Sequence, residues 1–489
     1  MEGSTNHTLQ QLIETLRAKR LVRTVTGETN TLLSAVCDDS RKAEPGSLFV
    51  AVAGTTADGH DFIPAAVERG AAALVVEQPG HSAAGLPVVE VANSRLALAV
   101  LSHVMAGRPS DKLRVVGVTG TNGKTTTAWL IHHLLTVVGR ETGLLGSIES
   151  RIGARRLAAS LTTPGPIELS SALAEMVNAG CTDCVMEVSS HALAQHRASG
   201  IRFSAGVFTN LTRDHLDYHG TWEAYFQAKK VLFDGLDSDA AAVYNVDDPS
   251  GEQITSDTSA EHHGYGRTEK ADYRFRVVES ALDGIRLEVD GLDRKFNLIG
   301  GFNAYNLTAA YSLGRAFGYA KATVLDALAS AAPVPGRIEQ IQVANGATVI
   351  LDFAHTPDGL ENVLSAVREI APPDSHLWCV FGCGGDRDRG KRPLMGEIAE
   401  RLADEVVVTS DNPRTEPPQA ILDDIRPGMR RPEQARWIVD RREAIRYAGA
   451  NVRPGDTVVI AGKGHENYQV VGRERIHFDD REEVRRWFS

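Results

Sequence analysis

Short apolar runs alternate with segments of helical periodicity along most of the chain. In its middle part the apolar runs predict strands, and the segments between them repeat apolar residues at helical spacing. The strands are expected near residues 114–118, 184–188, 205–209 and 241–246, and the helices near 125–138, 167–179 and 222–234. Such alternation is typical of a parallel sheet with helices on both faces. We therefore expect a central, doubly wound α/β domain.

The parts before and after this middle region also have an α/β pattern. Residues 1 to about 108 predict strands at 47–52 and 73–76 around a helix at 63–69. The last part predicts strands near 347–352, 376–382, 404–409 and 456–461, and helices near 358–370, 391–402 and 441–449. We expect a smaller N-terminal α/β domain and a C-terminal Rossmann-like, mononucleotide-type sheet.

Domain boundaries are expected where turn-forming residues gather. Loop signals at residues 107–110 and 332–336 divide the chain into domains 1–108, 109–332 and 333–489. Three domains also suit a length of 489 residues, which is too long for one ordinary core.

Composition narrows the class of protein. Charged residues make up 24% and hydrophobic residues 42%, as in soluble globular proteins, and the net charge of −11 argues against a nucleic-acid binder. The sequence has neither a signal-peptide pattern nor an apolar run long enough to span a membrane. We expect a cytoplasmic protein. The five cysteines favour reduced structural thiols, because Cys181 and Cys184 have redox or metal spacing but lack a second Cys/His pair.

The strongest chemical motif lies between residues 115 and 126, where a buried strand runs into a glycine-rich turn that opens a helix. Backbone N–H groups without intrahelical partners converge there and favour an anion such as a nucleotide phosphate. Lys124 adds positive charge, and Thr125 has the hydroxyl that holds magnesium in such loops. A nucleotide phosphate site is therefore expected.

Two alternatives accompany this interpretation. The general pattern G-x-x-x-x-G-K-[ST] would place its first glycine at Val118, so residues 117–126 could be an ordinary strand–turn–helix corner. A second stretch, from Gly385 to Lys391, keeps the glycine spacing. Arg392 follows it, however, and cannot bind magnesium as a threonine hydroxyl does. Context favours the first stretch.

Further polar residues follow the predicted central strands. Glu187 emerges from an apolar strand, so it is either paired at a cost or holds a metal. His215 and His219 follow the next strand and are either ligands or loop histidines. Lys229 and Lys230 lie on a predicted helix, where a lysine is usually solvated. The residues alone do not choose between these alternatives.

Three polar loops follow strands of the last part. Asp411 to Arg414 follows one strand, Gly462 to Glu466 another, and Arg387 lies in the third loop. Arg414 is either surface charge or a clamp that binds a carboxylate through two parallel hydrogen bonds. Together the loops suggest a pocket for a small zwitterion.

Taken together, these motifs resemble the Mur ligases over nearly the whole chain. The resemblance rests on residues 120–125, 186–197, 210–220, 381–393, 411–418 and 461–469. Phosphate loops of that family also lack the first glycine of the general pattern. The resemblance implies three domains that bind UDP-sugar, ATP and amino acid, and an ADP-forming ligase of peptidoglycan precursor synthesis. The implied route phosphorylates a carboxylate, and an incoming amine then attacks the acyl phosphate.

The resemblance also assigns site residues. The implied ATP-binding residues are Gly120, Thr121, Asn122, Gly123, Lys124, Thr125, Thr126, Asn303, Arg337 and Asp352. The implied UDP-precursor-binding residues are Asp38, Ser40, Thr55, Thr56, Ala57, Thr162, Thr163, Ser189, Gln195 and Arg197. The family has Leu at the position of Asp38 and His-Gln at Thr55 and Thr56, so this chain departs from it there.

The catalytic and amino-acid-binding residues follow from the same resemblance. Lys124, Lys229, Glu187 and His215 are expected to be catalytic, and magnesium is expected on Thr125, Glu187, His215 and Lys229, the last as a carbamate. The alignment from His215 selects Lys229 over Lys230. The amino acid is expected at Arg387, Asp411, Asn412, Pro413, Arg414, Gly462 and Glu466.

The implied partners are ATP, UDP-N-acetylmuramoyl-L-alanyl-D-glutamate and meso-diaminopimelate, whose second carboxylate suits Arg414. We expect a monomer without nucleic acid or membrane insertion. The rivals within the class are other wall-peptide ligases and folylpolyglutamate synthetase. A nucleotide-binding regulator, a transport ATPase or a catalytically silent relative is the alternative outside it.

Overall fold

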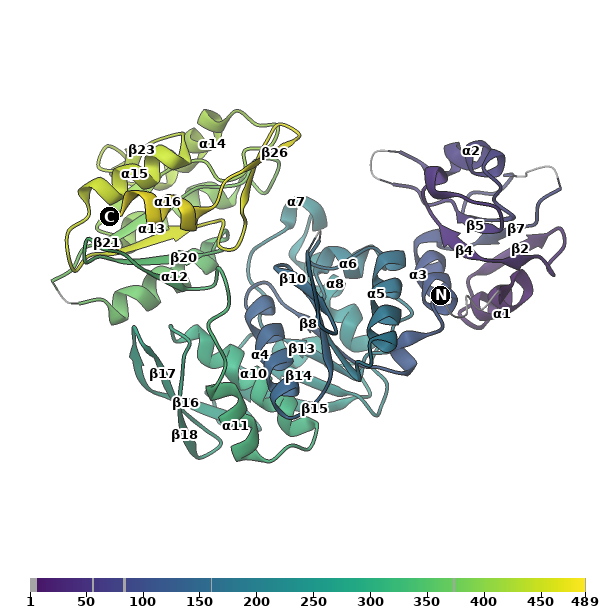
Figure 1. Cartoon of the computed structure of the whole chain (residues 1–489), viewed down its shortest axis with the longest axis horizontal. Coiled ribbons are helices and arrows are strands. Elements are labelled where there is room, and N and C mark those ends of the chain that lie inside the picture. The colour runs from purple at the N-terminus through teal and green to yellow at the C-terminus, as the bar shows by residue number, and fades with distance from the viewer. Residues whose placement is uncertain (1–6, 55–56, 82–84, 160, 373, 489) are drawn as a thin grey trace. The chain divides into compact units, whose positions relative to one another are not determined.

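The computed structural model describes residues 7–54, 57–81, 85–159, 161–372 and 374–488 (Figure 1). The chain forms two compact units. The first comprises residues 1–117, 140–205 and 235–240, and the second comprises 118–139, 206–234 and 241–489. Strand β8 (Arg114–Thr119) runs from the first unit into the second. The boundaries expected after residues 108 and 332 stay predictions.

The first unit begins with a five-stranded sheet of order β2-β7-β6-β5-β4. Its strands are β2 (Val22–Thr26), β4 (Ala35–Cys37), β5 (Ser47–Val50), β6 (Ala73–Val76) and β7 (Val88–Val91). Strands β4 to β7 are parallel, and β2 is antiparallel to β7. A short β1 (His7–Thr8) pairs with β3 (Leu32–Leu33).

Apolar side chains on both faces of this sheet explain its helices. Helices α1 (Leu9–Ala18) and α3 (Ser94–Met105) pack on the face that carries Val50 and Val75. Helix α2 (Ile63–Glu68) packs on the other face, against Phe49 and Leu74. Because successive strand residues point to opposite faces, the apolar runs at 47–50 and 73–76 supply both cores. The strands and the helix predicted for this part are confirmed.

The rest of the first unit belongs to a larger sheet. Its strands follow the order β11-β10-β9-β12-β8. Strands β9 (Thr142–Leu145) and β12 (Asp183–Glu187) are parallel, whereas β10 (Glu149–Ile152) and β11 (Arg155–Ala158) form an antiparallel extension. Helices α5 (Pro166–Asn178) and α6 (Ser190–Ala194) flank β12 in the chain. The predicted strand and helix are confirmed, but the hairpin β10–β11 was not predicted.

The second unit continues from β8 in the order β13-β14-β15-β16-β17-β18. The strands are β13 (Ala205–Phe208), β14 (Ala241–Asn245), β15 (Glu261–Gly266), β16 (Tyr273–Ala281), β17 (Gly284–Val289) and β18 (Leu292–Phe296). Its helices in this part are α4 (Lys124–Val137), α7 (Leu216–His219), α8 (Trp222–Asp234), α9 (Gly251–Ile254), α10 (Phe302–Ala316) and α11 (Lys321–Ala329). Strands β16 to β18 are antiparallel and extend the sheet beyond the predicted parallel part.

The last part of the second unit is a six-stranded sheet of order β19-β20-β24-β21-β22-β23. The strands are β19 (Glu339–Gln342), β20 (Thr348–Asp352), β21 (Leu377–Phe381), β22 (Glu405–Val408), β23 (Arg436–Trp437) and β24 (Thr457–Ala461). All are parallel to their neighbours except β19, which is antiparallel to β20. This confirms the predicted Rossmann-like sheet.

Helices cover both faces of this sheet. Helices α12 (Pro357–Ile370), α13 (Lys391–Leu402) and α14 (Pro418–Ile425) share one core with the sheet. Helices α15 (Arg441–Asn451) and α16 (Asp480–Trp487) share the other. A hairpin of β25 (Tyr468–Val471) and β26 (Glu474–His477) follows β24. Because β21, β22 and β24 are close neighbours and parallel, the loops after their carboxyl ends meet at one edge.

The cysteines agree with the expectation of reduced structural thiols. All five cysteines are buried free thiols. Over the ranges that the structure describes, no helix combines the length and apolarity needed to cross a bilayer.

Candidate functional site

The loop between β8 and α4 has the backbone that a phosphate loop requires. Gly120 and Gly123 adopt φ angles of +149° and +83°. A Cβ on Gly120 would lie 1.8 Å from Thr209 Oγ1, and one on Gly123 would lie 2.4 Å from Asn306 Oδ1. Only glycine fits both the conformations and the close approach. The loop ends where α4 begins at Lys124, so it borders the N-terminal turn of a helix, the position that favours an anion.

The segment after β13 holds this loop in place. The Asn122 N–H donates to Asn210 Oδ1 at 2.9 Å, and the Thr121 N–H donates to the Asn210 carbonyl at 2.8 Å. The hydroxyl of Thr209 and the amide of Asn210 both donate to the Asn122 carbonyl, at 2.6 and 3.2 Å. Residues far apart in sequence therefore fix the loop conformation.

Lys124 and Thr125 lie where the sequence predicted a phosphate. Lys124 Nζ donates to the carbonyls of Gly120 and Thr121, at 3.0 and 2.8 Å. Thr125 Oγ1 accepts a hydrogen bond of 3.0 Å from Arg337, whose guanidinium lies 4.5 Å from the centroid of the Phe353 ring. The structure thus brings Arg337, predicted to contact ATP, onto the phosphate loop.

The other predicted ATP residues have structural partners in the same unit. Asn303 donates to the Ile299 carbonyl at 2.7 Å and accepts from Asn306 at 2.8 Å. Asp352 accepts from the N–H groups of Ile338 and Ala354, both at 2.7 Å. Burial raises the pKa of Asp352, against the lowering effect of the nearby arginine at position 337.

Lys229 on α8 is buried against the phosphate loop. Its side chain is 1% exposed, its Nζ donates to the Gly120 carbonyl at 2.7 Å, and it lies 4.5 Å from the centroid of the Tyr225 ring. Burial and the neighbouring Lys124 lower the pKa of Lys229 well below its usual range, although Asp214 opposes them. The amine is therefore biased toward its neutral, nucleophilic form.

Lys230, one residue along, has a different environment. Its ammonium pairs with Asp234 and, at 2.7 Å, with Asp257. Burial lowers the pKa of Lys230, but these two carboxylates outweigh it and the net shift is upward. The pKa values of the two adjacent lysines therefore shift in opposite directions, because the two side chains have different neighbours.

Asp214 and His215 form a compact polar group beside Tyr225. His215 has a left-handed φ of +55°, and its Nε2 lies 3.2 Å from Asp214 Oδ2, while His355 Nε2 lies 3.9 Å from the same oxygen. Burial would raise the pKa of Asp214, but His215, His355 and Lys391 lower it to about 2. Asp214 is thus a buried anion that orients His215.

The phosphate loop also meets helix α12. Asn122 Nδ2 donates to Asp358 Oδ2 at 2.6 Å, and the Thr212 hydroxyl donates to the same oxygen at 3.4 Å. Burial raises the pKa of Asp358, and these hydrogen bonds oppose the shift.

In the first unit, Glu187 and predicted precursor residues form one hydrogen-bonded network. Glu187 Oε1 accepts from the Ser147 N–H at 2.7 Å, and its Oε2 accepts from the Ser147 hydroxyl at 3.1 Å. The Thr163 hydroxyl donates to the Glu187 carbonyl at 2.9 Å, and the Ser189 N–H donates to that hydroxyl at 3.0 Å. Glu187 is therefore a buried carboxylate with hydrogen-bond donors.

Three further predicted residues extend this network. Thr162 Oγ1 accepts from Ser147 at 3.0 Å. Arg197 donates to the Thr163 carbonyl at 3.1 Å and, through two nitrogens, to Gln195 Oε1 at 3.0 and 2.6 Å. The structure thus brings together Thr162, Thr163, Ser189, Gln195 and Arg197.

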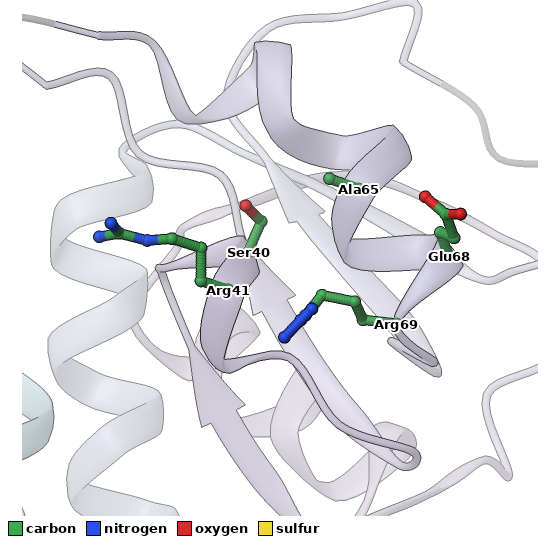
Figure 2. Close-up of a pocket in the computed structure, with 5 residues that line it drawn as sticks. All are labelled: Ser40, Arg41, Ala65, Glu68 and Arg69. Atoms are coloured by element: carbon green, nitrogen blue, oxygen red, sulfur yellow. The ribbon is translucent and has the colours of Figure 1, made fainter.

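The predicted uridine-end residues lie in the N-terminal sheet region. Ser40 lines a pocket of about 400 Å³ with Arg41, Ala65, Glu68 and Arg69. Figure 2 shows the Arg69 side chain extending from the end of α2 toward the turn that carries Ser40 and Arg41.

Of the other predicted uridine-end residues that the structure describes, Asp38 and Ala57 are not among those that line this pocket. Asp38 and Ala57 are exposed. Thr55 and Thr56 lie outside the described residues.

The loops after β22 and β24 form the predicted amino-acid region. Asn412 Nδ2 donates to Glu466 Oε2 at 2.9 Å, and Asn412 Oδ1 accepts from Lys463 Nζ at 3.0 Å. Lys463 Nζ also lies 3.6 Å from Asp411 Oδ1. Burial would raise the pKa of Asp411, but nearby cations, Lys463 first, hold it below its usual range.

Arg414 lies in the loop after β22 and has a left-handed φ of +54°. Its Nη1 donates to the Gly385 carbonyl at 2.7 Å, and it is partly buried, whereas Arg387 is exposed. Burial and the nearby Arg387 lower the pKa of Arg414. An anionic ligand group would offset this repulsion between two arginines.

Pro413 and Gly462 are buried in the same two loops. Gly462 has a φ of +116°, and a Cβ there would lie 3.5 Å from Asp411 Oδ1.

The competing glycine-rich stretch, from Gly385 to Lys391, does not form a phosphate loop, because the Arg392 side chain that follows it is 0% exposed and pairs with Glu416 and Asp424.

Sequence reasoning missed four polar residues near these loops. Asp214 and Lys463 are buried, and His355 and Asp358 are partly buried. Polar character alone gave no signal, because only the folded chain removes these side chains from water.

Metal ligation remains a prediction. Across the described parts of the chain, no group of three or more His, Cys, Asp or Glu side chains is arranged to hold a metal ion. The predicted magnesium ligands also include the Thr125 hydroxyl and a carbamylated Lys229, and neither is a His, Cys, Asp or Glu side chain.

Comparison with known proteins gives one consistent result. Three family models match the chain: the Mur ligase family, catalytic domain at residues 33–105; the Mur ligase middle domain at 118–314; and the Mur ligase, glutamate ligase domain at 336–464.

Curated relatives match along nearly the whole length. A UDP-N-acetylmuramoyl-L-alanyl-D-glutamate–2,6-diaminopimelate ligase of Cytophaga hutchinsonii is 44% identical, with 94% of this chain and 95% of that protein covered. The enzyme of the same name from Thermosynechococcus vestitus is 47% identical, with 91% of each covered. A solved structure with that name has a TM-score of 0.70 at 32% identity and covers 99% of both chains.

Proposed function

We infer the reaction from one premise: this chain belongs to the Mur ligase family. It is proposed to join meso-2,6-diaminopimelate to UDP-N-acetylmuramoyl-L-alanyl-D-glutamate, with ATP converted to ADP and phosphate, in peptidoglycan precursor synthesis. The names of the relatives at 44% and 47% identity support this substrate pair. We further propose that the protein acts as a monomer in the cytoplasm.

The observation that carries the proposal is the buried Lys229 against the phosphate loop. A neutral lysine amine can react with CO2 to form a carbamate, and the lowered pKa of Lys229 favours that form. The neighbouring Lys230 pairs with two carboxylates and would not react in this way. A nucleotide-binding regulator would not need such a lysine.

In the proposed first step, the γ-phosphoryl group of ATP moves to the side-chain carboxylate of D-glutamate. The N–H groups at the start of α4 and the charge of Lys124 would bind the phosphates. They would also neutralise charge that develops during transfer, where preorganised electrostatics contribute most of the rate enhancement. Arg337 would orient the loop through Thr125.

In the proposed second step, the amine of diaminopimelate attacks the acyl phosphate, and phosphate leaves as the amide forms. Arg387, Asn412 and Arg414 would bind carboxylates of the amino acid, while Gly462 and Glu466 would bind its distal amino end. Arg414 would form the bidentate pair that distinguishes diaminopimelate from lysine. Thr162, Thr163, Ser189, Gln195 and Arg197 would bind or orient the precursor.

The donor types present fit Mg²⁺, which prefers oxygen ligands. We propose that Thr125, Glu187 and His215, with Lys229 as its carbamate, hold it. When bound, the ion would polarise the transferring phosphoryl group. The buried anion Asp214 keeps His215 oriented, with Nε2 and Oδ2 3.2 Å apart.

The deciding experiment measures phosphate release from ATP and magnesium with the UDP-muramoyl dipeptide, with meso-diaminopimelate or L-lysine added in parallel. Release that depends on diaminopimelate is the expected result. Preference for lysine would retain the ligase but overturn the role of Arg414. Release that is independent of any acceptor would support an ATPase instead.

A further inference from the structure

The proposed amino-acid-binding region contains a buried cation, Lys463, which has no role in the proposed reaction so far. Lys463 follows β24 and is 0% exposed, so it cannot reach a ligand in solvent. Its Nζ donates to Asn412 Oδ1 at 3.0 Å and to the Tyr468 carbonyl at 2.7 Å, and lies 3.4 Å from Glu466 Oε2. The ammonium therefore contacts both loops proposed to bind the amino acid.

These contacts determine the orientation of Asn412. Its Oδ1 accepts from Lys463 Nζ and from the Val470 N–H, at 3.0 and 2.9 Å. Both partners are donors, so this atom must be the oxygen, and the amide nitrogen must point toward Glu466. A half-turn of the amide would place a donor against an ammonium. Lys463 thus sets which hydrogen-bonding group Asn412 presents.

The same ammonium balances two carboxylates. Asp411 Oδ1 lies 3.6 Å and Glu466 Oε2 3.4 Å from Lys463 Nζ. Burial and Asp411 raise the pKa of Glu466, whereas Lys463 and Asn412 lower it. Among the described residues, the charged or titratable groups that also act on this pair of carboxylates include Arg441, His355, Arg414, Cys383 and Tyr468.

We propose that Lys463 is a positioning residue for the amino-acid substrate: it fixes the amide of Asn412 and keeps the carboxylates of Asp411 and Glu466 in place to receive the distal amino end. This inference rests on the proposed function. Lys463 itself does not touch the substrate, because its side chain is enclosed by the two loops.

Three substitutions separate the charge of Lys463 from its hydrogen bonds. Lys463→Arg keeps the charge, Lys463→Gln keeps a donor without charge, and Lys463→Met keeps neither. For Lys463→Met we expect KM for diaminopimelate to rise at least about tenfold, as loss of a hydrogen bond to a charged group implies. KM for ATP should change by less than about twofold, because Lys463 contacts none of the proposed ATP residues.

The pH dependence of kcat/KM tests whether the charge of Lys463 acts on Glu466. Without the cation, the pKa of Glu466 rises, so the acid limb of kcat/KM for diaminopimelate should move to higher pH in Lys463→Gln and Lys463→Met. In Lys463→Arg it should stay near its wild-type position. Lys295→Met is the charge-matched control, because Lys295 is exposed and pairs only with Asp283 among the described contacts.

The unfolding temperature, the acid limb and KM of these variants together test the positioning role of Lys463. A purely structural role would lower the unfolding temperature of all three variants without moving the acid limb, and would overturn the proposal. An unchanged KM in Lys463→Met would also overturn it. Should Lys463→Met fail to fold, Lys463→Gln carries the same pH test. A wild-type protein that does not consume diaminopimelate would refute the proposed function instead.

Discussion

Lys229 and Lys463 are both buried almost completely, but their surroundings differ. Lys229 contacts a backbone carbonyl and an aromatic ring, with a second lysine nearby, and its pKa falls well below the usual range. Lys463 lies among two carboxylates and an amide oxygen. Burial alone therefore does not decide what a lysine does; its partners do. One position suits a reactive amine and the other an ion-paired cation.

The strongest test of the difference between Lys229 and Lys463 removes the amine of Lys229. Lys229→Met should lower kcat about a thousandfold or more, because the ligand that the carbamate would supply is lost. Its unfolding temperature should stay the same or rise, since a buried amine that donates to a backbone carbonyl is replaced by an apolar chain of similar length.

The matched control is Lys230→Met, which removes the neighbouring lysine and its pairs with Asp234 and Asp257. It should retain activity within about twofold, because partly exposed ion pairs contribute little. Equal activity losses in the two variants would contradict the distinction between the lysines. Phosphate release and thermal unfolding measure both effects.

The second prediction concerns Arg414, in the loop after β22. Arg414→Ala should lower kcat/KM for diaminopimelate about a hundredfold, because a charge-assisted pair to the second carboxylate is lost. KM for ATP should not change. The control is Arg401→Ala, which removes an exposed arginine paired with Glu361. Unaltered kinetics with diaminopimelate would refute the specificity role.

A smaller effect is expected where helix α12 meets the phosphate loop. Asp358→Ala removes the acceptor for Asn122 and Thr212 and should raise KM for ATP about three- to tenfold. Asp358→Asn keeps an acceptor oxygen and should remain within about twofold of wild type. If the two variants behave alike, the hydrogen bond to Asn122 does not support ATP binding.

The smallest effect on activity is expected when CO2 is removed from the buffer. Activity should fall about two- to fivefold in CO2-depleted buffer and return with bicarbonate, because carbamate formation is reversible and needs the neutral amine. The loss should grow as pH decreases, since acid protonates Lys229 in spite of its lowered pKa. Activity that is indifferent to CO2 at every pH would argue against a carbamate. Isotope-labelled bicarbonate and NMR would detect it directly.

Much of the fold could be predicted from periodicity. The strands at 47–50, 73–76, 183–187 and 457–461, and the helices at 124–137 and 391–402, lie within a few residues of their predicted positions. The antiparallel hairpins β10–β11 and β16–β18 were not predicted. Strands β10, β11 and β16 are partly or fully exposed along most of their length and have weaker apolar runs than buried parallel strands, so they give less signal.

The sequence predicted a phosphate loop from its glycines, lysine and threonine, and its resemblance to the Mur ligases predicted the precursor and amino-acid residues. Which polar residues are buried, and which partners they have, depends on how distant segments pack. Lys229 and Lys230 are adjacent in sequence, yet one faces the phosphate loop and the other two carboxylates. Lys463 likewise lies in a glycine-rich loop, and its burial depends on β25 and the loop after β22 packing around it. Charge and reactivity depend on those distant partners, and a local sequence pattern does not contain them.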